Sequence, residues 1–327
     1  MVFARRRLGR FVFACSLAGI GLLGIAALVE RWLEIQDARR LAGSETFVDL
    51  GGSRVRYRLA GAKRPGPAVV LLTGLSGSIE QWDQVQTGIG NFAPVLVYDR
   101  GGSGFSHGSG AYDARQQSDE LARLLTALGW DRRIILVGYS MSASVARVFA
   151  GRYRERVAGL ILVAPYMPEI EGRIAGRHGP RRSYARWLLH ESATTVFGIK
   201  RLAAFVASWR TPAVRATPLD NRVTAILARF EHWWAVDREV LATPTTSRQV
   251  VAAGGLTDLP VILLSDASPG LGPTGRVVDE VNRVFVERAG RGSLRSLGPV
   301  NHEVLLKEPA AYRVLIDAIR DMTAIAR

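Results

Sequence analysis

The chain has 327 residues, of which 48% are hydrophobic and 22% charged. This composition excludes disordered, collagen-like, coiled-coil and low-complexity proteins, and the length suits one large domain or two. The net charge of +14 comes mostly from scattered arginines, without an RNA-binding aromatic motif, so we expect no nucleic-acid partner. The single cysteine, Cys15, excludes an internal disulfide and a cysteine-based metal site.

The N-terminus is a basic segment followed by an apolar one. Residues 1–10 contain four arginines, and residues 11–29 contain no charge. An apolar stretch of this length spans a membrane as a helix. A cleaved secretory signal is the alternative, but the charged sequence that follows is a poor cleavage site. We predict a cytoplasmic tail over 1–10, an uncleaved transmembrane anchor over 11–29, a linker over 30–46, and a main domain on the outer side.

The main domain begins with a predicted β-hairpin. Residues 47–59 are β-prone on both sides of two consecutive glycines. Arg54, Arg56 and Arg58 alternate with apolar residues, so we expect one face of the second strand to contact water.

Strands and helices then alternate along the chain. Apolar runs predict buried strands at residues 68–72, 94–98, 133–138, 157–163 and 260–264, followed by a short strand at 293–297. Helical patterns occupy 114–128, 142–153, 277–289 and 309–325. This alternation predicts an α/β fold in which a mostly parallel sheet carries helices on both faces, with the core formed by residues 47–164 and 251–327.

Residues 165–250 interrupt the alternation. The segment contains four tryptophans, and residues 221–241 have the spacing of one amphipathic helix. An all-helical insertion between two strands of an α/β sheet predicts a cap over the strand ends. The tryptophans are most simply explained as packing between cap helices.

A serine lies between a predicted strand and a predicted helix. The segment is Gly138-Tyr139-Ser140-Met141-Ser142. A sharp turn there would push the hydroxyl of Ser140 out of the sheet, beside the free N–H groups of the helix start, as in a nucleophile elbow. The same pattern is also typical of a plain helix N-cap. Ser142 stands where the usual elbow has a second glycine.

Four segments together resemble the α/β-hydrolase fold superfamily. They are Thr73-Gly74-Leu75-Ser76-Gly77, the 98–106 loop YDRGGSGFS, the 138–142 elbow, and Asn301-His302-Glu303. Their order and their places at strand ends match the family over roughly residues 47–327. The resemblance implies a serine hydrolase that needs no cofactor or metal.

The resemblance assigns Ser140 as nucleophile and His302 as its base. A serine hydroxyl needs a base to remove its proton. His302 follows the last short strand and precedes the closing helix, so the fold would bring it to the elbow. The resemblance also implies an oxyanion hole formed by the backbone N–H groups of Leu75 and Met141. The loop that begins at Asp99 is predicted to be structural.

The resemblance places the catalytic acid in the loop after the seventh strand, where Asp266 is the only carboxylate. Asp266 lies slightly earlier than the usual place, which aligns with Ser268. Some relatives carry the acid after the sixth strand, where this chain has Ala164, with Glu169 and Glu171 further on. We predict Asp266.

Other titratable residues are given no catalytic role. The remaining histidines lie in the glycine-rich loop or in the predicted cap: His107, His178, His190 and His232. Two carboxylate pairs are predicted to lie on solvated helix faces: Asp119 with Glu120, and Asp237 with Glu239.

These observations predict a membrane-anchored serine hydrolase that cleaves an ester, and the apolar cap with the nearby membrane favours a lipid-like substrate. A serine nucleophile argues against dehalogenase and epoxide-hydrolase chemistry, which need a carboxylate. A hydrolase-like scaffold without turnover is the main alternative, motivated by Thr73, Ser142 and the early acid. A cofactor-free perhydrolase or haloperoxidase-like activity would use the same residues.

Overall fold

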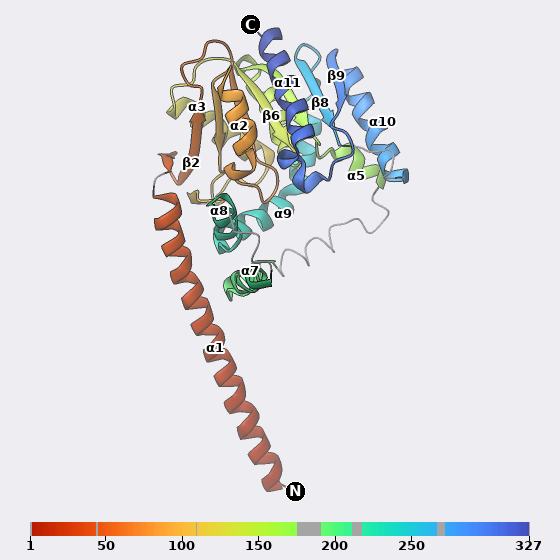
Figure 1. The fold of residues 1–327 in the computed structure, drawn as a ribbon. Coiled ribbons are helices and arrows are strands. Elements are labelled where there is room, and N and C mark those ends of the chain that lie inside the picture. The colour runs from red at the N-terminus through yellow and green to blue at the C-terminus, as the bar shows by residue number, and fades with distance from the viewer. Residues whose placement is uncertain are drawn as a thin grey trace.

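The computed structural model describes residues 2–43, 45–108, 110–174, 191–210, 218–266 and 272–326. Parts of the predicted cap lie outside the described residues, as do His178, Trp187, His190 and the alternative acid position at Ser268. Within the described part, a sheet with helices on both faces forms the body of the molecule, and one long helix projects from it (Figure 1).

The sheet has nine strands in the described part of the chain, in the order β1-β2-β4-β3-β6-β7-β8-β9, with β5 paired to β2. The strands are β1 Thr46–Asp49, β2 Ser53–Ala60, β3 Ala68–Leu72, β4 Val95–Tyr98, β5 His107–Gly108, β6 Ile134–Tyr139, β7 Val157–Val163, β8 Pro260–Ser265 and β9 Arg291–Ser296. The strands β4, β3, β6, β7, β8 and β9 are parallel, and β2 pairs antiparallel with β1 and β4. All five predicted core strands, the hairpin and the last short strand are present.

The helices are α1 Val2–Ala42, α2 Asp83–Gly90, α3 Ala114–Ala127, α4 Ser142–Arg152, α5 Pro168–Ile174, α7 Ile199–Arg210, α8 Pro218–Leu227, α9 Phe230–Ala252, α10 Gly272–Arg288 and α11 Pro309–Ile325. Short 3₁₀ turns lie at η1 Ile79–Trp82, η2 Arg154–Arg156 and η4 His302–Lys307. Among these, α3, α4 and α10 pack on one face of the sheet and α2 and α11 on the other. The predicted α/β fold with a mostly parallel sheet is therefore confirmed.

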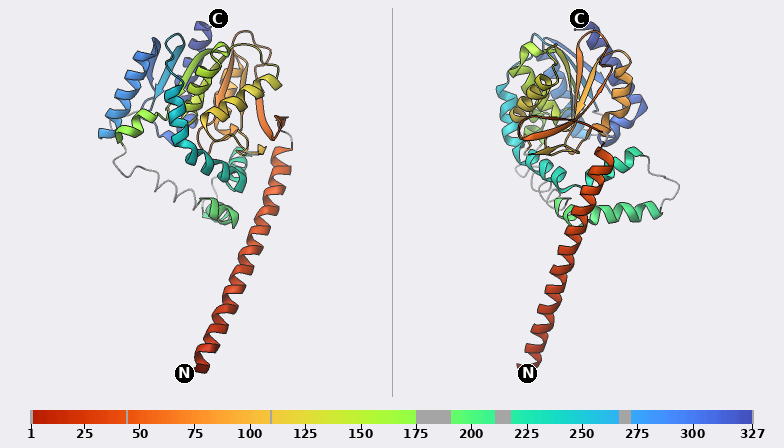
Figure 2. Two further views of the ribbon diagram at one scale, coloured as in Figure 1. Left: turned by 180° about the vertical axis from the view of Figure 1, so that it is seen from behind. Right: turned by 90° about the vertical axis from the view of Figure 1, so that its left-hand side faces the viewer.

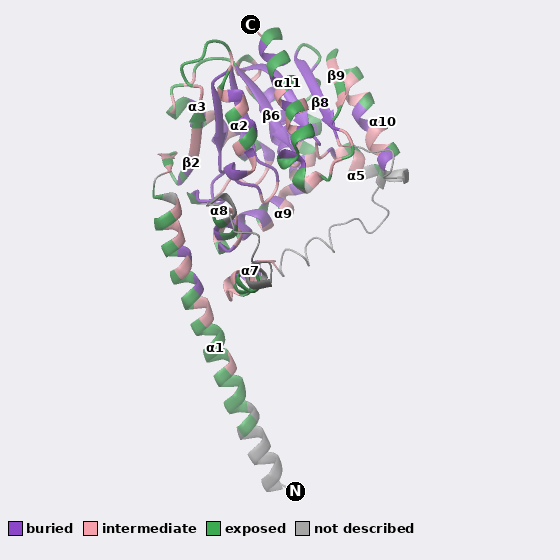
Figure 3. Cartoon of the chain, viewed as in Figure 1, coloured by how far each residue is buried: buried purple, intermediate pink, exposed green. Residues whose placement is uncertain are grey.

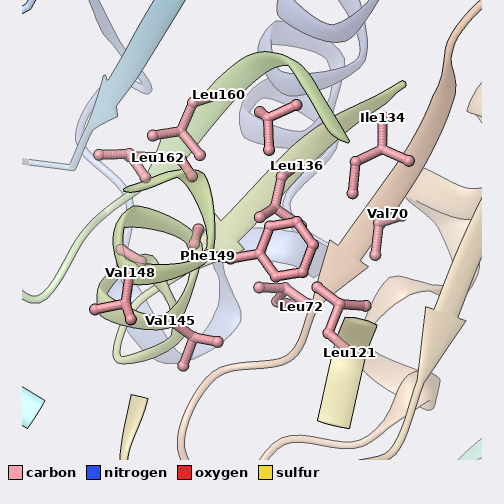
Figure 4. Close-up of a cluster of buried hydrophobic side chains, with 14 of the residues drawn as sticks. Val70, Leu72, Leu121, Ile134, Leu136, Val145, Val148, Phe149, Leu160 and Leu162 are labelled. Carbon is pink, nitrogen blue, oxygen red and sulfur yellow. The ribbon is translucent and has the colours of Figure 1, made fainter. Parts of the chain in front are cut away.

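The core lies on both faces of the sheet because alternate side chains of a strand point to opposite sides. In β3, Val70 and Leu72 join the cluster that contains Phe149 of α4, as Figure 4 shows. Val69 and Leu71 join the cluster on the other face. A strand buried on both faces has a continuous apolar sequence, which is why these strands were predictable. The buried sheet stands out against the exposed helix α1 in Figure 3.

The predicted single helix over residues 221–241 is wrong. The structure has two helices there, α8 and α9, separated by Arg229 in an extended conformation with φ −86° and ψ 126°. The guanidinium of Arg229 is buried, 2.8 Å from Glu231 and over the ring of Phe105. These tertiary contacts break a helix that the apolar spacing alone would continue.

The prediction of a wet arginine face on the second strand is wrong at its centre. Arg56 in β2 is fully buried. Its guanidinium donates to both carboxylate oxygens of Glu80, at 2.9 and 2.7 Å, and to Asp99 at 2.7 Å. Two carboxylates therefore compensate one buried cation. These contacts hold the η1 turn and the 98–106 loop against β2.

Two carboxylates predicted to be solvated are also buried. Glu120 of α3 accepts from the backbone N–H of Gly101 at 3.2 Å, and Glu239 of α9 pairs with Arg100. Both face the loop after β4 instead of water. That loop supplies the Arg100 cation to Glu239 and the backbone N–H of Gly101 to Glu120.

The helix α1 projects away from the body, towards the N-terminus of the chain (Figures 1 and 2). Its segment Phe13–Leu41 contains an 18-residue window with a mean hydropathy of 2.0, so the helix is long and apolar enough to cross a membrane. The helix continues through the predicted linker as far as Ala42. Its second half contacts the described cap helices, where Arg201 of α7 binds Glu30 and the backbone N–H of Phe230 donates to Glu34 at 2.8 Å.

Candidate active site

Ser140 lies at the carboxyl end of β6, between the strand and α4. Its φ is +54°, in the left-handed region that side chains other than glycine rarely adopt. The backbone N–H of Ser140 donates to the carbonyl of Val163 in the neighbouring strand at 2.9 Å, which fixes the turn. Such strain is retained where the surrounding structure enforces it, and it often marks a functional residue.

The residues on both sides of the turn explain how it is tolerated. A Cβ atom at Gly138 would lie 2.8 Å from Cα of Ala143, so only glycine fits. At the position where the usual pattern has a second glycine, the hydroxyl of Ser142 donates towards the carbonyls of Leu72 and Tyr139, at 3.0 and 2.9 Å. Ser142 therefore ties the elbow to the end of β3.

His302 begins the η4 turn, before α11, and it faces Ser140. Its Nε2 atom lies 2.9 Å from Oγ of Ser140. Tyr139 holds it from the other side: the two rings stack with centroids 5.2 Å apart, and the Tyr139 hydroxyl donates to the backbone carbonyl of His302. The residue before the serine thus orients the imidazole.

Asp266 completes the arrangement. It follows β8 directly, and its Oδ2 atom lies 2.8 Å from Nδ1 of His302. An ionised carboxylate can only accept, so Nδ1 carries the proton and Nε2 is left to accept one from Ser140. The side chains of His302 and Asp266 remain partly exposed, at 43% and 22%. The structure therefore brings three predicted residues from the ends of three segments into one hydrogen-bonded series.

The alternative acid positions differ in their contacts. Glu169 pairs with Arg147 at 3.0 Å, and Ala164 offers no side-chain oxygen. The side chain of Glu171 lies outside the described part of the structure.

The 73–77 loop passes close to Ser140. A Cβ atom at Gly74 would lie 3.4 Å from Cβ of Ser140, so the loop backbone runs beside the serine. Leu75 is the next residue, and Met141 follows Ser140 immediately before α4. Leu75 also packs on Trp233 and Val236 of α9. Both predicted oxyanion donors thus lie in segments that border the serine.

A buried arginine fixes this loop, and no local sequence pattern indicates its role. Arg100 donates to the carbonyl and the hydroxyl of Thr73, at 2.6 and 2.8 Å, and to the carbonyl of Gly74 at 3.1 Å. It also pairs with both oxygens of Glu239 on α9, at 2.9 and 3.0 Å. The guanidinium of Arg100 therefore connects the 73–77 loop to α9.

Comparison with known proteins agrees with this geometry. Residues 67–189 match the family model of the alpha/beta hydrolase fold. A structure described as a "putative lipase" from Acinetobacter baumannii superposes with a TM-score of 0.63 at 18% identity, over 90% of this chain and 96% of that one. The chain therefore has the fold of the α/β hydrolases, and its residues 67–189 resemble that family in sequence.

Curated relatives of this chain are matched only in part. An uncharacterized protein of Mycobacterium tuberculosis is 30% identical over 119 residues, which cover 36% of this chain and 34% of that protein. A protein of Escherichia coli named "Putative carbamate hydrolase RutD" is 28% identical over 195 residues, 59% of this chain and 66% of that protein. The chain thus spans about a third of the length of the first relatives it matches.

Two histidines of the chain lie outside the series Ser140–His302–Asp266. His232 of α9 is fully buried, and its Nδ1 accepts from the backbone N–H of Gly104 at 3.1 Å. Burial, with the nearby Arg229 cation, lowers the pKa of His232 to about 3, so this imidazole is neutral. His107 lies 3.1 Å from Glu231 at the surface. These contacts give both residues structural partners.

Proposed function

We propose that this chain is a membrane-anchored serine hydrolase that cleaves a carboxylic ester through an acyl-enzyme. Ser140 is the nucleophile, His302 the general base and acid, and Asp266 the residue that orients His302. The observation that carries the proposal is the hydrogen-bonded series from Ser140 through His302 to Asp266, with a strained serine at a strand end.

The proposed reaction has two halves. In the first, Oγ of Ser140 attacks the ester carbonyl while Nε2 of His302 takes its proton, and the alcohol leaves with that proton. In the second, water attacks the acyl-enzyme by the same route and releases the acid. The negative charge on the carbonyl oxygen is stabilised by the N–H groups of Leu75 and Met141. The Asp266 carboxylate stabilises the imidazolium of His302 in both halves.

A fluorophosphonate probe tests the nucleophile. Full-length protein in detergent micelles should be labelled, and Ser140→Ala should abolish labelling with the fold retained. Ser144→Ala is the matched control, because Ser144 lies one turn further along α4 and is buried; it should label as the wild type does. Folded wild-type protein that is not labelled would support the scaffold alternative instead.

A panel of substrates tests the bond and the acyl group. We propose a lipid-like ester, because the helix next to the body is apolar enough to lie in a membrane. Acyl esters of graded chain length should be cleaved faster as the chain lengthens, and matched carbamates and peroxide-dependent oxidation should be slower. Faster cleavage of the carbamates would contradict the ester proposal and would support carbamate hydrolysis, the reaction for which the Escherichia coli relative is named.

The membrane topology is proposed from charge. The segment before the apolar stretch is basic, so we place the N-terminus in the cytoplasm and the hydrolase body outside. Alkaline phosphatase fused after Arg327 should be active in a bacterial host, because the fusion point then lies outside the cytoplasm. A stably expressed but inactive fusion would contradict this topology.

A further inference from the structure

The cap helix α7 has its polarity reversed relative to an ordinary surface helix. Residues at i, i+3 and i+7 lie on one face of a helix. In α7 that face is exposed and carries Ile199, Leu202, Phe205 and Val206, which are 50%, 61%, 53% and 42% exposed. Ala203 is exposed on the same side. Each of these five side chains is apolar.

The described charged side chains of α7, Lys200 and Arg201, point towards the protein instead. Lys200 pairs with Glu191 and lies 3.3 Å from the centre of the Trp233 ring. Arg201 binds Glu30 at 2.9 Å and Asp37 at 2.6 Å. A helix that pairs its charges internally and exposes its apolar side chains is suited to a surrounding medium that is not water.

The partners of Arg201 show where this apolar face lies. Glu30 directly follows the predicted span at 11–29, and Asp37 is two turns further along α1. The flanking residues of α1 are also exposed and apolar: Leu28 at 73%, Val29 at 50% and Trp32 at 58%. Figures 1 and 2 show α7 beside α1, between the hydrolase body and the N-terminal end. Tryptophan is typical of the level at which a helix leaves the bilayer.

We propose that the outer face of α7 is a second membrane contact, which lies in the surface of the same bilayer that α1 spans. This inference rests on the proposed anchor, whose exposed residues Leu28, Val29 and Trp32 flank Glu30, the residue that binds α7. The bilayer is preferred over a second copy of the chain because Arg201 fixes α7 at the level of the exit of α1, where any protomer anchored by α1 meets lipid. The cap is then held against the membrane by two helices.

The consequence concerns how substrate arrives. The helix α9 binds Arg100 through Glu239 and packs on Leu75, and it also binds α1 through the backbone of Phe230. Elements that border the proposed site are thus connected to the membrane-facing surface, so a lipid-like ester would reach the cap from the bilayer.

Site-specific labelling of the full chain tests this contact. In a Cys15→Ser background, one introduced cysteine carries a polarity-sensitive fluorophore, and the protein is reconstituted into phosphatidylcholine vesicles with or without nitroxide-labelled phosphatidylcholine. Ile199→Cys reports on α7. Ile325→Cys is the matched control, because this isoleucine is 53% exposed at the far end of α11. Leu22→Cys reports on the anchor itself.

We expect the label at position 199 to shift its emission to the blue and to lose intensity with the nitroxide lipid, while the label at 325 does neither. Quenching at position 22 without quenching at 199 would overturn the α7 contact and leave the anchor intact. No quenching at 22 would overturn both. A label at 199 that is shielded from aqueous iodide but not quenched by nitroxide lipid would indicate a second copy of the chain and would also overturn the proposal.

Discussion

The closing helix α11 and the cap helix α7 bury opposite kinds of side chain. In α11, Leu315, Ile319 and Met322 are fully buried against the sheet, while Arg320 and Asp317 form an exposed pair. In α7, Lys200 and Arg201 face the protein and the large apolar residues face outwards. We infer that the exposed face of α11 contacts water and that the exposed face of α7 contacts a less polar medium.

The two helices also differ in what covers their apolar side chains. The buried face of α11 packs on α2, on η4 and on the sheet that leads to Ser140 and Asp266. The apolar side chains of α7 at positions 199, 202 and 206 are instead 42–61% exposed. The predictions below probe first the region that the sheet organises and then the contrast between the two helices.

The largest expected effect is on activity and comes from replacing Asp266, the carboxylate proposed to orient His302. Asp266→Asn should lower kcat/KM for an ester about 10⁴-fold with little loss of stability, because an amide can donate to Nδ1 and hold the wrong tautomer of His302. Initial rates with a chromogenic ester measure this. Glu169→Gln is the control and should keep a rate near that of the wild type; if Glu169→Gln lost activity and Asp266→Asn did not, the acid would be misassigned.

The next effect is on stability and comes from replacing Arg56, the buried cation of β2. Arg56→Met should lower the free energy of unfolding by about 3–5 kcal/mol, because Glu80 and Asp99 would remain buried without their cation. Arg54→Met, on the same strand but exposed, should change it by less than about 0.5 kcal/mol. Urea unfolding in detergent micelles compares the two, and equal effects would mean that the pairing of Arg56 adds nothing.

A matched pair of leucines tests the helix comparison itself. Leu315→Ala in α11 should cost about 2–5 kcal/mol of unfolding free energy, since it leaves a cavity against the sheet. Leu202→Ala in α7 should cost less than about 0.5 kcal/mol, because 61% of the residue is already exposed in the folded protein. A large loss from Leu202→Ala would show that α7 packs within the protein.

The smallest effect depends on pH. Burial raises the pKa of Glu120 from 4.5 to about 7, so the folded protein keeps a proton that the unfolded chain releases. The folded state therefore binds more protons between these values, and stability falls as pH rises from 4.5 to about 7 and stays lower above it. At about 1.4 kcal/mol per pKa unit, the loss is at most about 3.5 kcal/mol.

Glu120→Gln removes this titration while keeping an oxygen that can accept from Gly101. The variant should gain stability over the wild type as pH rises through that window, and the two should be nearly equal below it. Unfolding curves recorded below pH 4.5 and above pH 7 measure the difference. A difference that does not change with pH would contradict the raised pKa of Glu120.

The sheet and the three residues of the series were predictable because their signals are local. A strand buried on both faces is apolar throughout, and Ser140 and Asp266 each directly follow such a strand. The buried ion pairs were not predictable, because Arg100 and Glu239 lie 139 residues apart and each looks like an ordinary charged residue in its own segment. The break at Arg229 and the inward charges of α7 likewise depend on tertiary partners, which apolar spacing does not reveal.

The central claim is that Ser140 forms a covalent bond with the acyl group. Full-length protein mixed with a chromogenic acyl ester and quenched in acid within one turnover should gain the mass of one acyl group, on the peptide that contains Ser140, and Ser140→Ala should gain none. Hydrolysis of the ester by wild-type protein without such an adduct, or with the adduct on another residue, would contradict the account.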